Sequence, residues 1–311
     1  MGEIKWMQDG AYGLMVHYLK DIMPRRGEKN DDWEAMTAAF PIERFSDAVK
    51  AAGASWLIFP FGQNNGHYCS ENPHLPGRCS KRDLMMELAL ALNKRGIRLI
   101  VYLPSEVDSC PQEEREALGW DLDPHDKSVY MERYMEIIRY WSLKFGSLIS
   151  GWWFDGCYQS SEKPFTRTHE WDNSRFNYQL WQAAARAGNP DAVIAMCPGA
   201  ETMGYVFKEQ DYLAGEANTL NHQNDGPLID GMQWHCLIWL DCFWMHSKEP
   251  GEIVPPRFTD EEVIAFMLRC KEQNGAVTWN VGIYEDGTMA EKTLAQIGKV
   301  KKALEVVKNN N

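Results

Sequence analysis

The chain has 311 residues, of which 44% are apolar and 24% charged, and its formal net charge is −12. This length is typical of one large α/β domain, and the acidic balance disfavours nucleic acid, whose phosphates attract clustered Lys and Arg. The mean hydropathy of −0.45 and the lack of any run of 18 apolar residues predict that no segment spans a membrane.

The cysteines and the first residues bear on the compartment. None of the eight cysteines has the C-x-x-C spacing of a zinc site, and several, such as Cys197 and Cys236, lie in apolar runs, so buried thiols of a reduced cytoplasmic protein are expected. The start, Met-Gly-Glu-Ile-Lys-Trp, has no basic segment followed by an apolar one and predicts no signal peptide. An exported protein that has lost its leader would look the same, and there Cys69 and Cys79, which flank a polar loop, could pair.

Short apolar runs alternate with amphipathic segments along the whole chain. Glycines at 53, 96, 146 and 188 end four of the predicted helices. Thr259, with Glu262 three residues later, predicts the capped start of another. In chain order the prediction is strand 12–17, helix 43–52, strand 55–61, helix 81–94, strand 97–103, helix 126–145, strand 148–155, helix 174–187, strands 192–197, 211–216 and 236–243, helix 259–273, strand 276–283 and helix 290–308.

The predicted strands are continuously apolar, which indicates a parallel sheet buried on both faces. Eight such strands with intervening helices predict a (β/α)8 barrel of the TIM type rather than a doubly wound sheet. The weakest unit is the sixth, whose strand at 211–216 is short. Neither a linker-like stretch nor an internal repeat divides the chain, so a single domain over residues 1–311 is expected.

In such a barrel the chemistry lies at the carboxyl ends of the strands. Asp155 follows four apolar or aromatic residues there and precedes a glycine. A carboxylate among aromatic side chains at a strand mouth is typical of a covalent nucleophile for an oxocarbenium-like centre, although an Asp in this place can also cap a turn. The polar residues that end the predicted strands are His17, Gln63, Asn64, Asn65, Tyr102, Glu106, Asp155, Glu216, Asp241, His246 and Asn280.

The run Trp-Trp-Phe-Asp-Gly at 152–156 resembles the nucleophile strand of glycoside hydrolase family 29, the α-L-fucosidases. Further similar segments lie in the same order along roughly residues 6 to 305. The resemblance implies a retaining exo-glycosidase that cleaves a terminal α-L-fucoside or related sugar through a glycosyl ester on Asp155. No counterpart of the C-terminal β-sandwich usual in the family is expected within this sequence. The other similar segments are 13–17, 45–54, 96–102, 211–216, 234–244 and 274–282.

The departures from the family concern sugar recognition. Its Lys-His-His-Asp-Gly-Phe segment reads Gly-Gln-Asn-Asn-Gly-His at 62–67, which replaces paired imidazoles by uncharged amides. Leu213 stands where the family has Arg, and His235 where it has Glu. Lost hydroxyl partners change sugar discrimination by large factors. A retaining glycosidase for another sugar and a sugar-binding barrel without catalysis therefore stay open as alternatives.

A retaining mechanism also needs a protonated group close to the nucleophile. Glu216 is the first candidate, because partial burial at the mouth of the sixth strand would raise its pKa toward that of a working acid. His235 is the second, by its alignment with the family's Glu, although it could equally be a core histidine. Glu201 is the third.

The expected ligand is a carbohydrate. Neither the G-x-G-x-x-G nor the P-loop motif is present, and the His-x-His of metal-dependent barrels is missing after the first strand, so no cofactor and no metal are expected. A homo-oligomer stays open. Within the barrel, Trp153 is expected to share the inward side with Asp155, and Trp152 the outward side; Asp241 is also expected to point inward. The residues expected to contact the sugar are His17, Gln63, Asn64, Tyr102, Trp153, Asp241 and Trp279.

Overall fold

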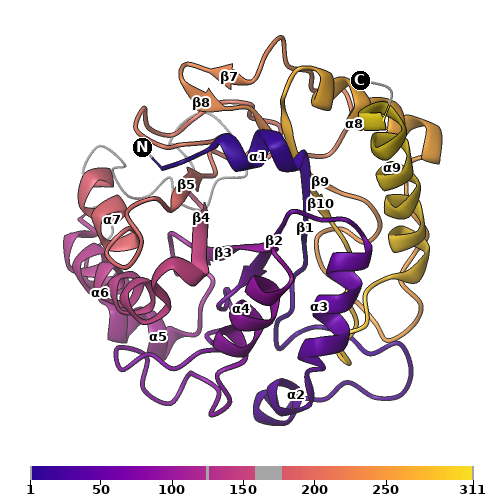
Figure 1. Cartoon of the computed structure of the whole chain (residues 1–311). Helices are drawn as coiled ribbons and strands as arrows, with labels where there is room; N and C mark the ends of the chain where they lie inside the picture. Colours follow the sequence, from indigo (N-terminus) through magenta and orange to yellow (C-terminus); the bar gives the residue numbers. More distant parts are fainter. Residues whose placement is uncertain (1, 124–125, 158–176, 310–311) are drawn as a thin grey trace.

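Eight parallel strands curl into a ring, in the order β5-β4-β3-β2-β1-β10-β9-β6, in a computed structural model that describes residues 2–123, 126–157 and 177–309 (Figure 1). The predicted α/β barrel of the TIM type is confirmed. The strands of the ring are β1 (Tyr12–Met15), β2 (Trp56–Pro60), β3 (Arg98–Pro104), β4 (Ile149–Asp155), β5 (Val193–Met196), β6 (Glu216–Ala217), β9 (His235–Trp239) and β10 (Ala276–Asn280).

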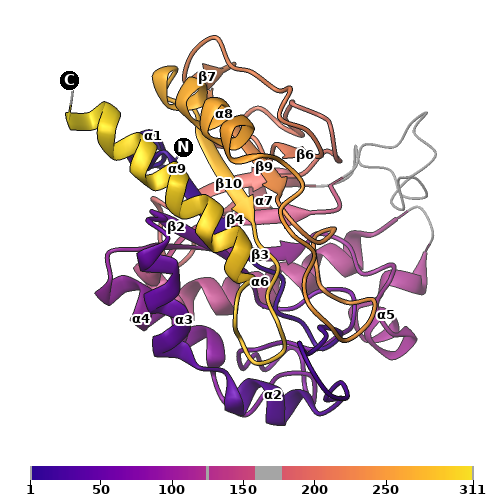
Figure 2. The ribbon, with the colours of Figure 1, turned by 90° about the vertical axis from the view of Figure 1, so that its right-hand side faces the viewer.

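The longer helices lie outside the ring, and Figure 2 shows α8 and α9 side by side along it. The capping box of Thr259 and Glu262 at the start of α8 is confirmed. The predicted helix 174–187 shortens to α7, and its residues 174–176 lie outside the described part of the chain. The predicted helices appear as α3 (Ile42–Ala51), α4 (Leu84–Lys94), α6 (Ser128–Phe145), α7 (Tyr178–Ala185), α8 (Asp260–Glu272) and α9 (Glu291–Asn309).

Several short elements were not predicted, because six or seven residues give too few turns for an apolar period to show. α1 closes the end of the ring where the strands begin: its Met7 packs inside, and its Trp6 contacts Trp56 at 5.7 Å between ring centroids. Among the described helices none is long and apolar enough to cross a membrane. The short elements are α1 (Lys5–Gly10), α2 (Trp33–Ala39), α5 (Gln112–Leu118), the 3-10 turns η1 (Trp120–Leu122) and η2 (Gly146–Leu148), and the hairpin of β7 (Leu228–Ile229) and β8 (Met232–Gln233).

The ring is irregular between β5 and β6. The predicted sixth strand, 211–216, is wrong in extent, because a ladder forms only at Glu216–Ala217, and the described stretch 197–234 contains no helix. Side-chain pairing substitutes for the ladder: the Asp211 carboxylate accepts from the Ile194 backbone N–H at 2.7 Å and from Arg186. The Asp211 backbone N–H donates to Ile194 O at 2.8 Å. Two hydrogen bonds thus join β5 to the segment that leads into β6, and an ion pair joins the end of α7 to the same segment.

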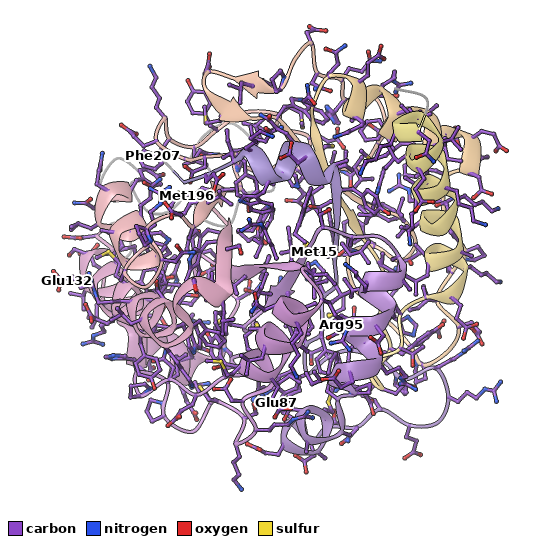
Figure 3. The ribbon with its side chains drawn as sticks, viewed as in Figure 1. Met15, Glu87, Arg95, Glu132, Met196 and Phe207 are labelled. Atoms are coloured by element: carbon purple, nitrogen blue, oxygen red, sulfur yellow. The ribbon has the colours of Figure 1, made fainter. Side chains whose placement is uncertain are left out.

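Alternation along the strands divides the core into two parts. Side chains such as Ile58, Ile100 and Trp153 fill the interior of the ring, whereas Trp152 packs outward among the helices, as predicted. Figure 3 shows the same contrast between Met15, inside the ring, and Glu132, on the outer surface of α6. Because α1 and the inner side chains fill the end of the ring where the strands begin, the interior of the ring opens at the carboxyl ends of the strands.

All eight cysteines are free, including Cys69 and Cys79, and six of the eight are buried. Burial raises the pKa of the Cys69 thiol well above its usual range, so this group stays protonated at neutral pH. The cysteines therefore act as small apolar side chains in this fold. The exception is Cys197, which lies beside the pocket.

Candidate active site

A pocket of about 480 Å³ opens at the carboxyl ends of the strands. Eight of the residues singled out from the sequence line it, brought together from β3, β4 and β6 and from the segments that follow β1 and β2. They are His17, Gln63, Asn64, Asn65, Tyr102, Trp153, Asp155 and Glu216. The remaining lining residues are Met15, Leu19, Asp21, Leu237, Phe243, Trp244, Met245 and Ser247.

Asp155 ends β4 at the floor of the pocket, and hydrogen bonds orient its carboxylate. The Tyr102 hydroxyl donates to Oδ2 at 2.6 Å, and the Gly156 backbone N–H donates to Oδ1 at 2.8 Å. Tyr102 is itself held by stacking on Trp153, with 5.4 Å between ring centroids. Gly156 has a φ of +74°, and a Cβ there would come within 2.8 Å of Glu106, so glycine suits this turn. The carboxylate is thereby presented to the pocket in one fixed orientation.

Glu216, the first residue of β6, faces Asp155 across the pocket. Burial, and then the negative charge of Asp155, raise the pKa of Glu216 to about 7. The Cys197 thiol donates to its Oε2, with 3.1 Å between Sγ and oxygen. A carboxyl group with this pKa is protonated in a large fraction of molecules at neutral pH, as a general acid requires.

The spacing of the two carboxyl groups indicates which chemistry they suit. One oxygen of each and the Cys197 Sγ all lie within 4.8 Å of one another. Carboxyl groups about 5–5.5 Å apart are typical of retaining glycosidases, whereas inverting enzymes need about 6.5–9.5 Å to admit a water molecule. These three groups could in principle ligate a metal. However, burial holds the pKa of the Cys197 thiol well above its usual range, so sulfur acts here as a donor rather than a thiolate ligand.

The uncharged polar side chains of His17, Gln63 and Asn64 form the opposite wall of the pocket, and the exposed carboxylate of Asp21 also lines the pocket. His17 is 7% exposed, and burial lowers its pKa to about 4, so the ring is neutral. Its Nδ1 lies 3.4 Å from Gln63 Oε1, while its Nε2 and the Oδ1 of Asn64 have no hydrogen-bond partner among the described residues. Buried polar atoms without partners are costly. In a pocket they are suited to hydrogen bonds with ligand hydroxyls.

Two acid/base candidates lie away from the pocket. His235 is fully buried: its Nδ1 donates to Leu213 O at 2.9 Å, and its Nε2 accepts from the Thr278 hydroxyl at 2.7 Å. Both nitrogens are thus engaged, and burial lowers the pKa of His235 to about 4, so the structure places it as a core histidine. Glu201 does not line the pocket; its carboxylate accepts from His222 at 2.7 Å on the surface.

Two expected sugar contacts also lie elsewhere. The expectation that Asp241 points into the barrel is wrong, because β9 ends at Trp239 and the chain turns. The Asp241 carboxylate instead accepts from the Gly282 backbone N–H at 2.9 Å and from Thr293 of α9 at 2.7 Å. Trp279 points outward from β10 and packs against Phe266 of α8 at 5.9 Å between ring centroids. Neither residue lines the pocket, so neither is placed to touch a sugar there.

The segment after β9 supplies a wall that the sequence reasoning missed. Phe243 and Trp244 both line the pocket, and the rings of Trp244 and His17 pack in a T-shaped arrangement with 6.3 Å between their centroids. Trp244 has a φ of +59°, and the Met245 N–H donates to Phe243 O at 2.7 Å across it. A bulky residue with positive φ is strained, and such strain gathers at functional sites. The apolar run 236–243 concealed this turn, since Cys and Phe continue the strand pattern.

Neither a protein-family model nor a curated protein matches the sequence, whereas solved structures match the fold. A variant of the α-L-fucosidase AlfC has a TM-score of 0.65 at 16% identity, over 99% of each chain. The chain has the fold of the α-L-fucosidases. Isoenzyme 1 from Paenibacillus thiaminolyticus, another α-L-fucosidase, has a TM-score of 0.64 at 17% identity, over 97% of this chain and 75% of that one.

Endo-fucoidan hydrolases of glycoside hydrolase family 107 have the same fold. One has a TM-score of 0.68 at 16% identity, over 97% of this chain. Three structures, of two of these proteins, contain longer chains, of which this chain spans between 53% and 64%. The fucosidase-like fold expected from the sequence is thus confirmed.

Proposed function

We propose that the chain is a retaining glycosidase that removes a terminal α-L-fucosyl or related sugar residue, with Asp155 as nucleophile and Glu216 as acid/base. The observation that carries the proposal is the carboxyl pair at retaining distance, with one member held by Tyr102 and the other with a pKa near 7. A turn-capping Asp155 would need neither a partner carboxyl nor a pocket.

In the first step Asp155 Oδ attacks the anomeric carbon while the bond from that carbon to the leaving oxygen breaks. Glu216 gives its proton to that oxygen, so the leaving group departs as an alcohol and the sugar stays as an ester of Asp155. In the second step ionised Glu216 takes a proton from water, whose oxygen attacks the same carbon and releases Asp155. The carboxylate and the acid are both restored.

The pocket wall favours a single neutral sugar. Its volume of about 480 Å³ lies in the lower part of the range of about 300–1,000 Å³ for ligand pockets, which suits one terminal residue better than a long stretch of polymer. Neutral His17 and the amides of Gln63 and Asn64 can each donate or accept hydrogen bonds. They can therefore bind hydroxyl groups without favouring a charged sugar.

A panel of nitrophenyl glycosides tests the activity and identifies the sugar. Asp155→Ala should abolish hydrolysis, and azide should partly restore it by attacking the anomeric carbon from the vacated side. Glu209→Gln is the control, an exposed carboxylate outside the pocket, and should keep nearly full activity. Proton NMR should find the first product with retained configuration. An inverted product would refute the role of Asp155, and binding without turnover of any sugar would favour a sugar-binding barrel.

A further inference from the structure

Beside Glu216 the surface continues outward from the pocket along β6 and β9. The two strands pair with Glu216 opposite Leu237, and the next residues on the same side of each are Asn218 and Trp239. The Trp239 indole N–H donates to Asn218 Oδ1 at 2.8 Å. This pair therefore lies beyond the proposed acid, toward solvent.

Arg257 and Phe243 complete this surface. The Arg257 guanidinium lies 3.5 Å from the centroid of the Trp239 ring and donates to the backbone carbonyl of Asn218. The Phe243 ring meets Trp239 edge-on, at 5.3 Å between centroids and 86° between planes. We refer to Asn218, Trp239, Phe243 and Arg257 as the outer platform.

Phe243 stands out by its exposure. It is 63% exposed, and within residues 2–123, 126–157 and 177–309 no other Phe, Tyr or Trp side chain is comparably exposed. A single exposed apolar side chain is common on protein surfaces, but this ring lines the pocket and packs against Trp239, so it is placed to contact a ligand there. Its backbone takes part in the strained turn at Trp244, which fixes the direction of the ring rather than leaving it on a flexible loop.

The outer platform lies on the side of the pocket where the leaving group of the proposed reaction would bind. A general acid must reach the oxygen of the departing group, so that group lies on the Glu216 side of the pocket. An aromatic face with hydrogen-bond donors at its edge matches the apolar face and peripheral hydroxyls of a pyranose ring. Such donors are present: the Nδ2 of Asn218 has no acceptor among the described residues, and of the Arg257 side-chain nitrogens only Nη2 has one.

We propose that the outer platform is a leaving-group subsite that binds a second sugar ring, stacked on Phe243 and hydrogen-bonded by Asn218 and Arg257. The natural substrate is then a disaccharide or the end of an oligosaccharide, rather than a glycoside of a small alcohol. This inference rests on the proposed glycosidase activity and deepens it by naming the leaving group.

The experiment compares two substrates with the same transferred sugar, α-L-fucosyl fluoride and fucosyl disaccharides of N-acetylglucosamine, galactose and glucose. Fluoride has no ring to stack, whereas Phe243 also lines the pocket that both substrates enter. Phe243→Ala should therefore lower kcat/KM for the preferred disaccharide roughly tenfold more than kcat/KM for the fluoride. Phe243→Tyr should restore the disaccharide activity. Leu180→Ala, which truncates an apolar side chain of α7 that is 52% exposed, should affect neither substrate.

Two results would overturn the subsite: equal losses on fluoride and disaccharide, or no loss on any disaccharide. If the wild type hydrolyses neither substrate, the assignment of fucose as the transferred sugar fails, and the subsite is then judged by binding. Saturation-transfer NMR with methyl glycosides of the three leaving sugars should show contact in the wild type that is lost in Phe243→Ala. Absence of contact in the wild type would refute the subsite as well.

Discussion

The hydrogen bond from the Cys197 thiol to Glu216 gives a prediction whose sign differs between two substitutions. A donor stabilises the ionised form of a carboxyl group and so lowers its pKa. Cys197→Ala removes the donor and should raise the pKa of Glu216 above its value of about 7. Cys197→Ser substitutes a stronger donor at the same place and should lower the pKa.

The size of the shift follows from the strength of the bond. Hydrogen bonds to charged groups contribute about 1.5–3 kcal/mol, and a thiol is a weak donor, so about 1 kcal/mol is expected for a sulfur–oxygen distance of 3.1 Å. Since one pKa unit corresponds to about 1.4 kcal/mol, the pKa of Glu216 should rise by roughly 0.7 units in Cys197→Ala. Cys197→Ser should shift it by a similar amount in the opposite direction.

The assay is the pH dependence of kcat/KM on the best nitrophenyl glycoside. A general acid must be protonated at the start, so activity falls as pH rises through the pKa of Glu216 in the free enzyme. This alkaline limb should move up in Cys197→Ala and down in Cys197→Ser. Cys236→Ala is the control: that thiol is equally buried, but it lies among the outward-packed residues of β9. A limb that stays in place or moves the same way in both Cys197 variants would refute the reasoning.

Further predictions concern the residues around the carboxyl pair and the irregular side of the ring. Tyr102→Phe removes the donor to Asp155 and should lower kcat/KM by roughly 10–100-fold in steady-state assays, with little change in the urea midpoint. Asp211→Asn leaves Arg186 without its buried partner and should reduce the free energy of unfolding by about 3 kcal/mol in urea titrations. An unchanged urea midpoint would contradict the role of Asp211 in holding the ring together between β5 and β6. The pKa of His235 falls to about 4 in the fold, whereas the unfolded chain binds a proton below pH ~6.5. Stability should therefore decrease as pH drops from 6.5 toward 4, and His235→Asn should flatten this part of the profile without moving the alkaline limb of activity.

Local sequence patterns were informative where one strand decides the geometry. The aromatic run before Asp155 predicted both a buried strand and a polar residue at its end, and alternation correctly placed Trp153 inside the ring and Trp152 outside. The same reasoning failed for Asp241, because an apolar run does not reveal where a strand ends and a turn begins. It also missed Trp244, whose positive φ depends on contacts with the rest of the loop.

The sequence by itself determined the architecture and the candidate nucleophile, because both depend on patterns within single segments: apolar runs at regular intervals and an Asp at the end of one of them. Only the tertiary structure decided which groups meet. It brought Glu216 opposite Asp155, set their separation, added the Cys197 thiol, and placed His235 in the core. These are relations between strands distant in sequence, and the pKa of a carboxyl group depends on its neighbours in space.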